Sequence, residues 1–162
     1  MKDKFIKLHS SENNSPVIVN VDSIAQVLFS HETTSTGHSK NVSVIITEKK
    51  ASLAPFNVNE NIEMIFNMLP DDVFVKFHSY ENNAAIVLRK ESIVAVETCK
   101  KYNLKKTIIY FNSDISMNSL VINENPDKVF ESLNSKNEIS KNNSILNKTK
   151  DKANGINSII QK

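Results

Sequence analysis

Apolar residues occur along most of the chain in short blocks separated by polar, turn-type segments, and this pattern predicts β-strands. The blocks are rich in Val, Ile and Phe, which favour strands. Asn-Asn pairs, such as Asn13-Asn14, follow the first strand of each half, and Asn tolerates the left-handed backbone of a tight turn. The predicted strands are 5–8 and 73–77, 17–21 and 86–88, 24–29 and 93–98, 42–47 and 107–111, and 52–56 and 116–122.

Two segments instead have the 3.6-residue period of a helix with one apolar face. In the first, residues spaced i, i+3, i+4 and i+7 are apolar: Ile62, Ile65, Phe66 and Leu69. In the second, the matching positions are Val129, Phe130 and Leu133. Asn61 and Asn125 precede these segments and are predicted N-caps, while Pro126 suits a first helical position, where no N–H is needed.

The chain contains an internal sequence repeat. FIKLHSSENN at 5–14 and FVKFHSYENN at 74–83 share seven of ten residues. This alignment continues without a gap, at an offset of 69, as far as Val27 and Val96. It resumes at an offset of 64 and ends at Leu69 and Leu133, with Asn-Glu-Asn in common. We therefore expect a tandem duplication of a unit of about 65 residues.

The predicted fold class is α+β, with two tandem, pseudo-symmetric modules. Each module is expected to be a small antiparallel sheet of four to five strands followed by one short helix. The expected boundaries are 1–70 for the first module and 71–134 for the second. Because a module of this size has a marginal core of its own, we expect the two to share an apolar face, as in a fused homodimer. Residues 135–162 are rich in Lys, Asn and Ser and predict a tail that is largely disordered.

Composition narrows the class of protein. With one cysteine and no apolar run of signal-peptide or membrane-span length, a cytoplasmic protein is expected. Scarce Gly with abundant Asn, Lys and Ile suggests an AT-rich bacterial or phage genome. The net charge of +2 arises in the tail, where six Lys face two acids, whereas the rest is near neutral. A near-neutral body argues against a dedicated nucleic-acid-binding protein.

The candidate chemical groups do not form a catalytic set. His9 and His78 occupy equivalent positions and could bind a metal across a pseudo-two-fold axis, but capping of the adjacent turn is the favoured interpretation. We favour the interpretation that His31 and His38 are solvated loop residues. Asp22 and Glu91 are interpreted as turn carboxylates, and Cys99 as an incidental thiol. With two glycines there is no phosphate-binding loop, and no catalytic or metal-binding sequence motif is present. We expect no enzyme activity, no cofactor and no metal.

Two groups of cationic residues remain as candidate binding sites. A small anionic ligand at the module interface could contact Lys7, Lys76, Arg89 and Lys90. Nucleic acid could contact a basic cluster that contains an aromatic residue: Lys100, Lys101, Tyr102, Lys105 and Lys106. A solvated hairpin tip is the favoured interpretation of this second cluster.

The order of motifs in the first half resembles the small FlbD-like proteins, a bacterial family linked to flagellar gene clusters. The resemblance rests on Ile6-Lys7-Leu8, the Asn13-Asn14 turn, Asn20-Val21-Asp22-Ser23-Ile24 and the segment 58–69. The second half matches less well, since Arg89 replaces the Asn, and the turn glycines of the family are missing in both halves. The resemblance implies a small β-rich module and no catalytic residues.

These observations predict a noncatalytic protein-binding or assembly module, because duplication multiplies surfaces more readily than it creates chemistry. Its partner would be another protein or further copies of the chain. The alternative is a protein that sequesters a small, nucleotide-like ligand at the module interface. A third possibility is weak nucleic-acid binding through the Lys100–Lys106 cluster and the basic tail.

Overall fold

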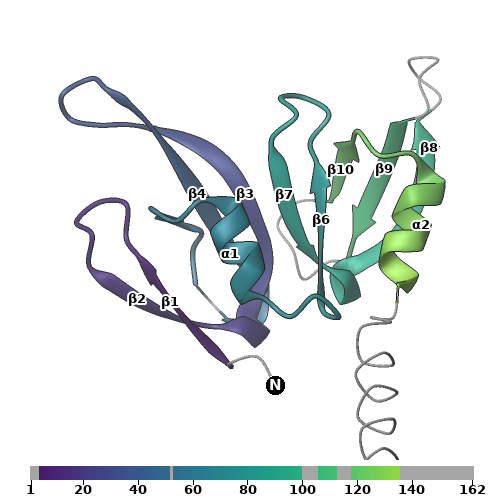
Figure 1. Cartoon of the computed structure of the whole chain (residues 1–162), viewed down its shortest axis with the longest axis horizontal. Helices are drawn as coiled ribbons and strands as arrows, with labels where there is room; N and C mark the ends of the chain where they lie inside the picture. The colour runs from purple at the N-terminus through teal and green to yellow at the C-terminus, as the bar shows by residue number, and fades with distance from the viewer. Residues whose placement is uncertain (1–3, 52, 100–105, 113–117, 136–162) are drawn as a thin grey trace, which may run out of the picture.

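A computed structural model describes residues 4–51, 53–99, 106–112 and 118–135 (Figure 1). The expected tail is 135–162, and all of it after Ser135 lies outside this part. The residues in the described ranges form antiparallel β-strands and two α-helices, so the α+β class is confirmed. The strands are β1 (Phe5–His9), β2 (Pro16–Asn20), β3 (Ile24–Thr33), β4 (Ser39–Thr47), β5 (Phe56–Val58), β6 (Phe74–His78), β7 (Ala85–Arg89), β8 (Ile93–Cys99), β9 (Lys106–Phe111) and β10 (Ser119–Ile122).

Both predicted helices form at the expected places. They are α1 (Ile62–Met68) and α2 (Pro126–Asn134). The Asn61 side chain accepts a hydrogen bond of 2.9 Å from the backbone N–H of Met64, and Asn125 does the same for Lys128. Both N-caps are therefore confirmed, and each satisfies one N–H that a helix start leaves without a partner. Three short 3-10 helices complete the described elements: η1 (Val21–Ser23), η2 (Lys49–Ala51) and η3 (Lys90–Ser92).

The strands are grouped differently from the expected one sheet per half. A five-stranded sheet has the order β5-β4-β3-β7-β6, and β1-β2 and β10-β9-β8 form smaller sheets. The five-stranded sheet crosses from one half to the other, because β3 pairs with β7 through Gln26 opposite Leu88 and Val27 opposite Val87. Hydrophobic alternation marks which residues form strands, but it does not determine which strand edges meet.

Two isolated bridges connect the sheets into one series. Ser10 bridges to Val58, which links β1 to β5, and Ser79 bridges to Ile122, which links β6 to β10. Across the described strands the series therefore runs β2-β1-β5-β4-β3-β7-β6-β10-β9-β8. In Figure 1 the β1–β2 hairpin lies at one side of the molecule and β8 at the other, with β3 and β7 between them. The two ends of the series are β2 and β8.

Strand registers recur along the chain. Phe5 pairs with Asn20 in the first hairpin, and Phe74 pairs with Arg89 in the second, at the sequence offset of 69. The β3–β4 ladder has an irregularity between Ile24 and Gln26, and the β8–β9 ladder has one between Ile93 and Ala95. Local sequence and local hydrogen bonding therefore agree in the two halves.

His31 and His38 were expected to be solvated loop residues, and this is wrong for His31, which lies in β3, but confirmed for His38, which lies in the exposed turn before β4. β3 continues to Thr33 and β4 begins at Ser39, so residues 34–38 alone make the turn. Gly37, at φ +80°, provides the left-handed backbone there. Between residues 31 and 41 the two strands carry mostly polar side chains that are exposed or half-buried, so this part lacks the apolar alternation by which a strand is recognised.

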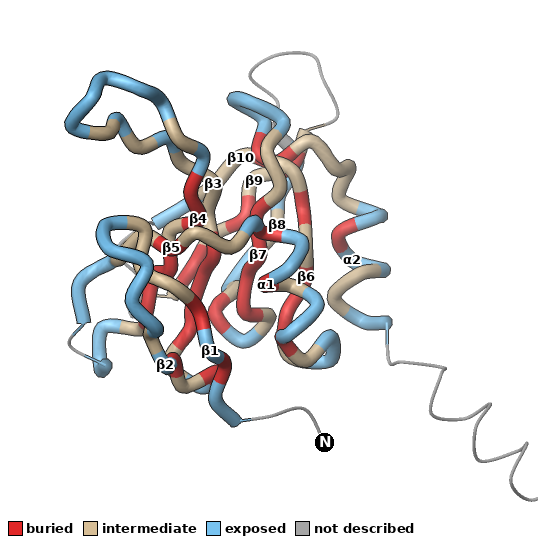
Figure 2. The backbone as a smooth tube through the Cα atoms, turned by 60° about the vertical axis from the view of Figure 1, so that its left-hand side comes forward, coloured by how far each residue is buried: buried red, intermediate tan, exposed pale blue. Residues whose placement is uncertain are grey.

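Two apolar cores lie on the two sides of the β3–β7 pair, and each includes residues from the other half. Phe74 and Val87 of the second half pack in the first core, with Ile65 of α1. Ala25 of the first half packs in the second core, with Val129 of α2. Figure 2 shows buried backbone concentrated in these central strands. The halves therefore contribute to each other's cores.

Candidate functional site at the strand edges

The repeated histidines are held by glutamates of the repeated Asn-Glu-Asn motif. His9 Nδ1 lies 2.7 Å from Glu60 Oε1, and the His9 backbone N–H donates to Glu60 Oε2 over 3.0 Å. His78 makes the same two contacts with Glu124, at 2.8 and 3.1 Å. The sequence favoured turn capping by these histidines but did not identify a partner residue. For His9 the partner is Glu60, a carboxylate 51 residues away in the sequence. Each carboxylate ties the end of one strand to the start of a helix.

The environment of Glu60 shifts its pKa. Burial by itself raises the pKa of this carboxyl group. The hydrogen bonds from the His9 ring, the His9 backbone and its own backbone act in the opposite direction, and so does the charge of His9. The lowering contributions together exceed the effect of burial, and the pKa of Glu60 falls below its ordinary value of 4.5. The carboxylate is therefore ionised at neutral pH and acts as a hydrogen-bond acceptor.

The first Asn of the motif fastens the adjacent turn. Asn59 Nδ2 donates to the carbonyl of Ser10 and to Asn14 Oδ1, at 3.0 and 2.9 Å. Asn123 makes the corresponding bonds to Ser79 and Asn83, at 3.0 and 2.8 Å. Asn14 and Asn83 have φ of 57° and 54°, the left-handed region in which Asn is tolerated. The repeated polar residues thus hold the hairpin turns onto the rest of the fold.

Other predicted candidates lie apart from one another. Asp22 and Glu91 are exposed in η1 and η3, and His31 lies edge-on to Phe29 with ring centroids 4.8 Å apart. His38 is exposed in the β3–β4 turn. Within the described ranges, no three His, Cys, Asp or Glu side chains come together as a metal site. Cys99 ends β8, and its side chain is outside the described part.

The aromatic-containing basic cluster is described at one residue. Lys106 Nζ lies 4.1 Å from the centre of the Tyr80 ring and donates to Asn123 Oδ1 over 2.7 Å. Lys40 of the first half also donates to the motif asparagine, Asn59, although by the offset of 64 the position equivalent to Lys106 is Val42. The remaining members lie outside the described residues: Lys100, Lys101, Tyr102 and Lys105.

The four cations predicted for an anionic ligand are spread over three strands and a 3-10 helix. Lys7 is exposed on β1, and Lys90 is half-buried in η3. Lys76, on β6, pairs with Glu63 at 2.7 Å and lies 5.3 Å from the centre of the Phe66 ring. Arg89 is buried at the end of β7. None of the four lines either of two pockets formed by described residues, so the anionic-ligand site remains a prediction.

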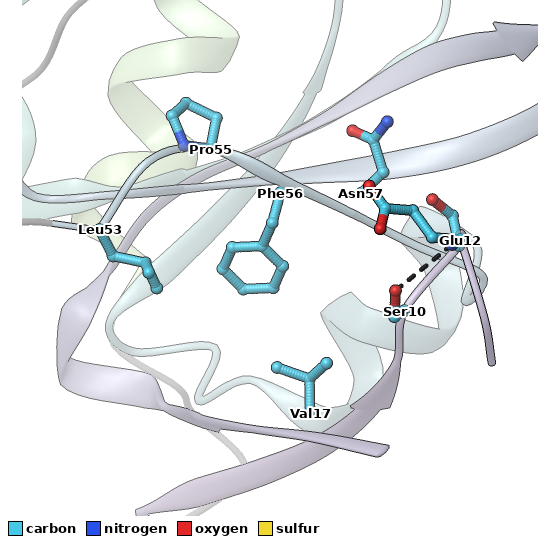
Figure 3. Close-up of a pocket in the computed structure, with 8 residues that line it drawn as sticks. Ser10, Glu12, Val17, Leu53, Pro55, Phe56 and Asn57 are labelled. Carbon is cyan, nitrogen blue, oxygen red and sulfur yellow. Dashed lines mark hydrogen bonds between the residues drawn. The ribbon is translucent and has the colours of Figure 1, made fainter. Parts of the chain in front are cut away.

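Those pockets are lined mostly by apolar and uncharged side chains. One, of about 410 Å³, lies between the β1–β2 hairpin and the segment leading into β5. In Figure 3 the Phe56 ring and the Val17 side chain point toward one another across it, while Ser10 accepts from the backbone N–H of Glu12. The other, of about 360 Å³, is lined by both halves, including Phe29, Ile62 and Ala85.

The junction between β3 and β7 is built from charged, polar and apolar contacts. Arg89 Nε donates to the carbonyl of Ile24 over 2.7 Å, and Nη2 donates to that of Val21 over 2.5 Å. Its guanidinium carbon lies 4.8 Å from the centre of the Phe74 ring. α1 lies against β7 and β3, so the Lys76 contacts with α1 cross the same junction. This interface joins one half to the other.

Apolar side chains are exposed on the end strands β2 and β8, on the neighbouring β1 and on α2, and the exposure of Phe130 shows that its predicted place on the apolar face of the second helix was wrong. Phe5, Ile18 and Val94 are 53%, 63% and 66% exposed. Phe130 of α2 is 69% exposed. The apolar character of these side chains, taken alone, predicts that they are buried. For Phe5, Ile18 and Val94, exposure can be inferred only once the strand order is known. These four residues are the candidate interaction surface, and the free edges of β2 and β8 beside them are referred to below as the open edges.

No family model matches the chain, and neither a curated protein nor a solved structure matches it. The resemblance to FlbD-like proteins therefore remains an expectation from short motifs. Among the helices that the structure describes, none is long and apolar enough to cross a membrane.

Proposed function

We propose that the chain is a noncatalytic protein-binding or assembly module made by internal duplication of one unit. The observation that carries this proposal is the β3–β7 junction, where an edge strand of one half pairs with an edge strand of the other. In this proposal the unit binds another unit through its strand edges, and the intact chain still has two such edges, β2 and β8, unpaired among the described strands.

The duplication is supported by local structure as well as by sequence. The hairpin registers, the irregularities in the ladders and the histidine–glutamate contacts each occur at matching positions in both halves. A pseudo-symmetric pair of modules accounts for all of them at once.

The absence of catalysis is proposed because the residues repeated in both halves have structural partners. His9 and His78 form hydrogen bonds with glutamates. Asn59 and Asn123 donate hydrogen bonds to carbonyls of the hairpin turns. The last asparagine of each Asn-Glu-Asn motif caps a helix. These side chains stabilise the unit, and this structural role explains why they are repeated without any catalytic role.

Site-specific photo-crosslinking tests the proposal. A photoreactive phenylalanine analogue replaces Val94 in one variant and Leu53, which is 55% exposed, in a matched control. Irradiation of cells producing each variant should give a discrete protein adduct from position 94 and none from position 53. The absence of an adduct at position 94, or equal adducts at both positions, would contradict a binding role for the edges.

A small-ligand-sequestering role is the second candidate, favoured by the 360 Å³ pocket that both halves line. Because the wall includes Phe29, Ile62 and Ala85, a ligand with a large apolar face would fit it. A thermal-shift screen with nucleotides should raise Tm for a bound member. The role would be excluded for that class if no compound shifts Tm.

A further inference from the structure

We propose that the partner at the open edges is a second copy of this chain, joined head to tail, with β8 of one copy pairing antiparallel with β2 of the next. This inference rests on the proposed function and names the partner. Its template is the β3–β7 pair inside the chain. At the repeat offset of 69, β8 is the counterpart of β3 and β2 is the counterpart of β7.

The exposed residues on the open edges are counterparts of residues buried at the junction. Phe5 is 53% exposed, whereas its counterpart Phe74 is 1% exposed. Ile18 is 63% exposed, whereas its counterpart Val87 is fully buried. A second copy would therefore cover two apolar side chains of the β1–β2 hairpin.

The same relationship holds on the other edge. Val94 is 66% exposed, whereas its counterpart Ala25 is fully buried. Ala25, Phe74 and Val87 are residues that pack in the core of the opposite half. Each open edge therefore presents apolar side chains at positions that the junction buries, and a protein surface of this kind marks an interaction site.

Charge complementarity favours a second copy over an unrelated partner. At the junction, Lys76 contacts Glu63 and Phe66 of α1. The counterpart of Lys76 is Lys7, which is exposed, and the counterparts of Glu63 and Phe66 are Asp127 and Phe130, both exposed on α2. Lys7 of one copy would therefore meet Asp127 and the Phe130 ring of its neighbour.

The template also specifies the register. Val27 faces Val87 and Gln26 faces Leu88 at the junction. By the offset of 69, Val96 of one copy faces Ile18 of the next, and Ala95 faces Val19. A shift by one residue would turn Ile18 away from the partner's core, so the apolar pattern selects this register.

One difference makes the contact between copies weaker than the junction. Arg89, which donates two hydrogen bonds across the junction, has Asn20 as its counterpart. The shorter Asn side chain already accepts from the backbone N–H of Asp22. Without the arginine contacts, we expect association between copies to be reversible and dependent on concentration.

The two edges differ, so the interface is heterologous: each chain offers one β8 and one β2. Heterologous contacts build rings if the rotation closes and filaments if it does not. In both cases the species is larger than the 18.3 kDa monomer. An isologous dimer, in which β8 pairs with β8, is the competing arrangement.

Mixing two full-length variants tests the inference. Ile18→Asp impairs the β2 edge and Val94→Asp impairs the β8 edge, and both side chains are exposed. By light scattering after size-exclusion chromatography, wild type and the control Met64→Asp, at a residue of α1 that is 49% exposed, should form oligomers. Each edge variant alone should be monomeric. An equimolar mixture should give a one-to-one dimer of twice 18.3 kDa, because one intact edge of each kind remains.

Other outcomes overturn the inference. A monomeric wild type at about 100 μM, or a mixture that stays monomeric while both variants are folded by circular dichroism, contradicts head-to-tail pairing. An Ile18→Asp variant that still dimerises indicates β8–β8 pairing. If the chain is monomeric but the photoreactive group at 94 captures a different protein, the binding function stands and the identity of the partner is wrong.

Discussion

Arg89 Nε lies 2.7 Å from the carbonyl oxygen of Ile24, on the opposite half of the molecule. The same side chain donates to the carbonyl of Val21 and is 6% exposed. Removing this guanidinium would be costly, because the Ile24 and Val21 carbonyls would each lose a hydrogen bond from a charged donor and Glu48 Oε1, 3.8 Å from Nε, would lose its cation. Arg89 therefore fixes how the two halves meet, and the open edges lack this contact.

Substitution of Arg89 by Ala should destabilise the fold by about 3–6 kcal/mol, since the carbonyls of Ile24 and Val21 each lose a hydrogen bond from a charged donor, worth about 1.5–3 kcal/mol. Urea unfolding at fixed chain concentration measures the change. The matched control is Asn20→Ala at the counterpart position, where loss of the bond to the N–H of Asp22 should cost about 1 kcal/mol. Equal effects of the two substitutions would contradict a special role for Arg89.

Glu60 should make stability depend on pH. Its pKa in the folded state is lowered below 4.5, so the ionised carboxylate contributes stability that is present above about 4.5 and is lost as pH falls through the folded value. We predict that Glu60→Gln destabilises the protein at pH 7 and that its difference from wild type shrinks toward pH 3. Urea unfolding at several pH values measures this difference.

The His9 ring supplies part of that effect. In a His9→Ala background the pH-dependent difference caused by Glu60→Gln should be smaller, because a main donor to the carboxylate is gone. An unchanged difference in that background would show that the His9 ring does not stabilise the ionised Glu60.

Asn14 should tolerate Gly better than Ala. Its φ of 57° costs a residue with a β-carbon roughly 1–2 kcal/mol unless the side chain compensates, whereas Gly adopts this region freely. Both substitutions remove the acceptor of Asn59 Nδ2, so this loss cancels when the two variants are compared. Thermal unfolding should show a larger loss of Tm for Ala than for Gly. A smaller loss for Ala would contradict the left-handed assignment.

Charge reversal should reveal the contact between Lys7 and Asp127 of neighbouring copies. Lys7→Glu and Asp127→Lys should each weaken self-association, and the double variant should recover part of the loss. An exposed ion pair contributes about 0.2–1 kcal/mol, which is at most about fivefold in Kd. Analytical ultracentrifugation measures the constants, and Lys4→Glu serves as an exposed control. Strictly additive effects would exclude this contact.

Local elements were predictable because their signals are local. The helix caps at Asn61 and Asn125 and the hairpin turns follow from residues adjacent in sequence. The clamp between His9 and Glu60 spans 51 residues, and its signal was the shared occurrence of both residues in the two repeats. The repetition of the histidine and the glutamate in both halves indicated that each has a structural role. It could not indicate that the two residues contact each other.

The exposure of the candidate interaction surface could not be predicted in the same way. Phe5 and Phe74 occupy the same place in the repeated decamer, yet one is 53% exposed and the other 1%. Their difference arises from what lies beside each hairpin, which depends on the pairing of β3 with β7. Strand order is a property of the whole fold, and the hydrophobic pattern of a strand carries little information about it.

Cross-linking of paired cysteines tests the central claim most directly, namely that the open edges pair in the register of the junction. A Val96→Cys chain and an Ile18→Cys chain, both carrying Cys99→Ser, would be mixed and oxidised. Residues directly opposite on antiparallel strands lie within disulfide reach. The account predicts a mixed 96–18 disulfide between chains and little from a Val96→Cys with Pro16→Cys pair. A dominant 96–96 disulfide, or equal yields from both pairs, would contradict it.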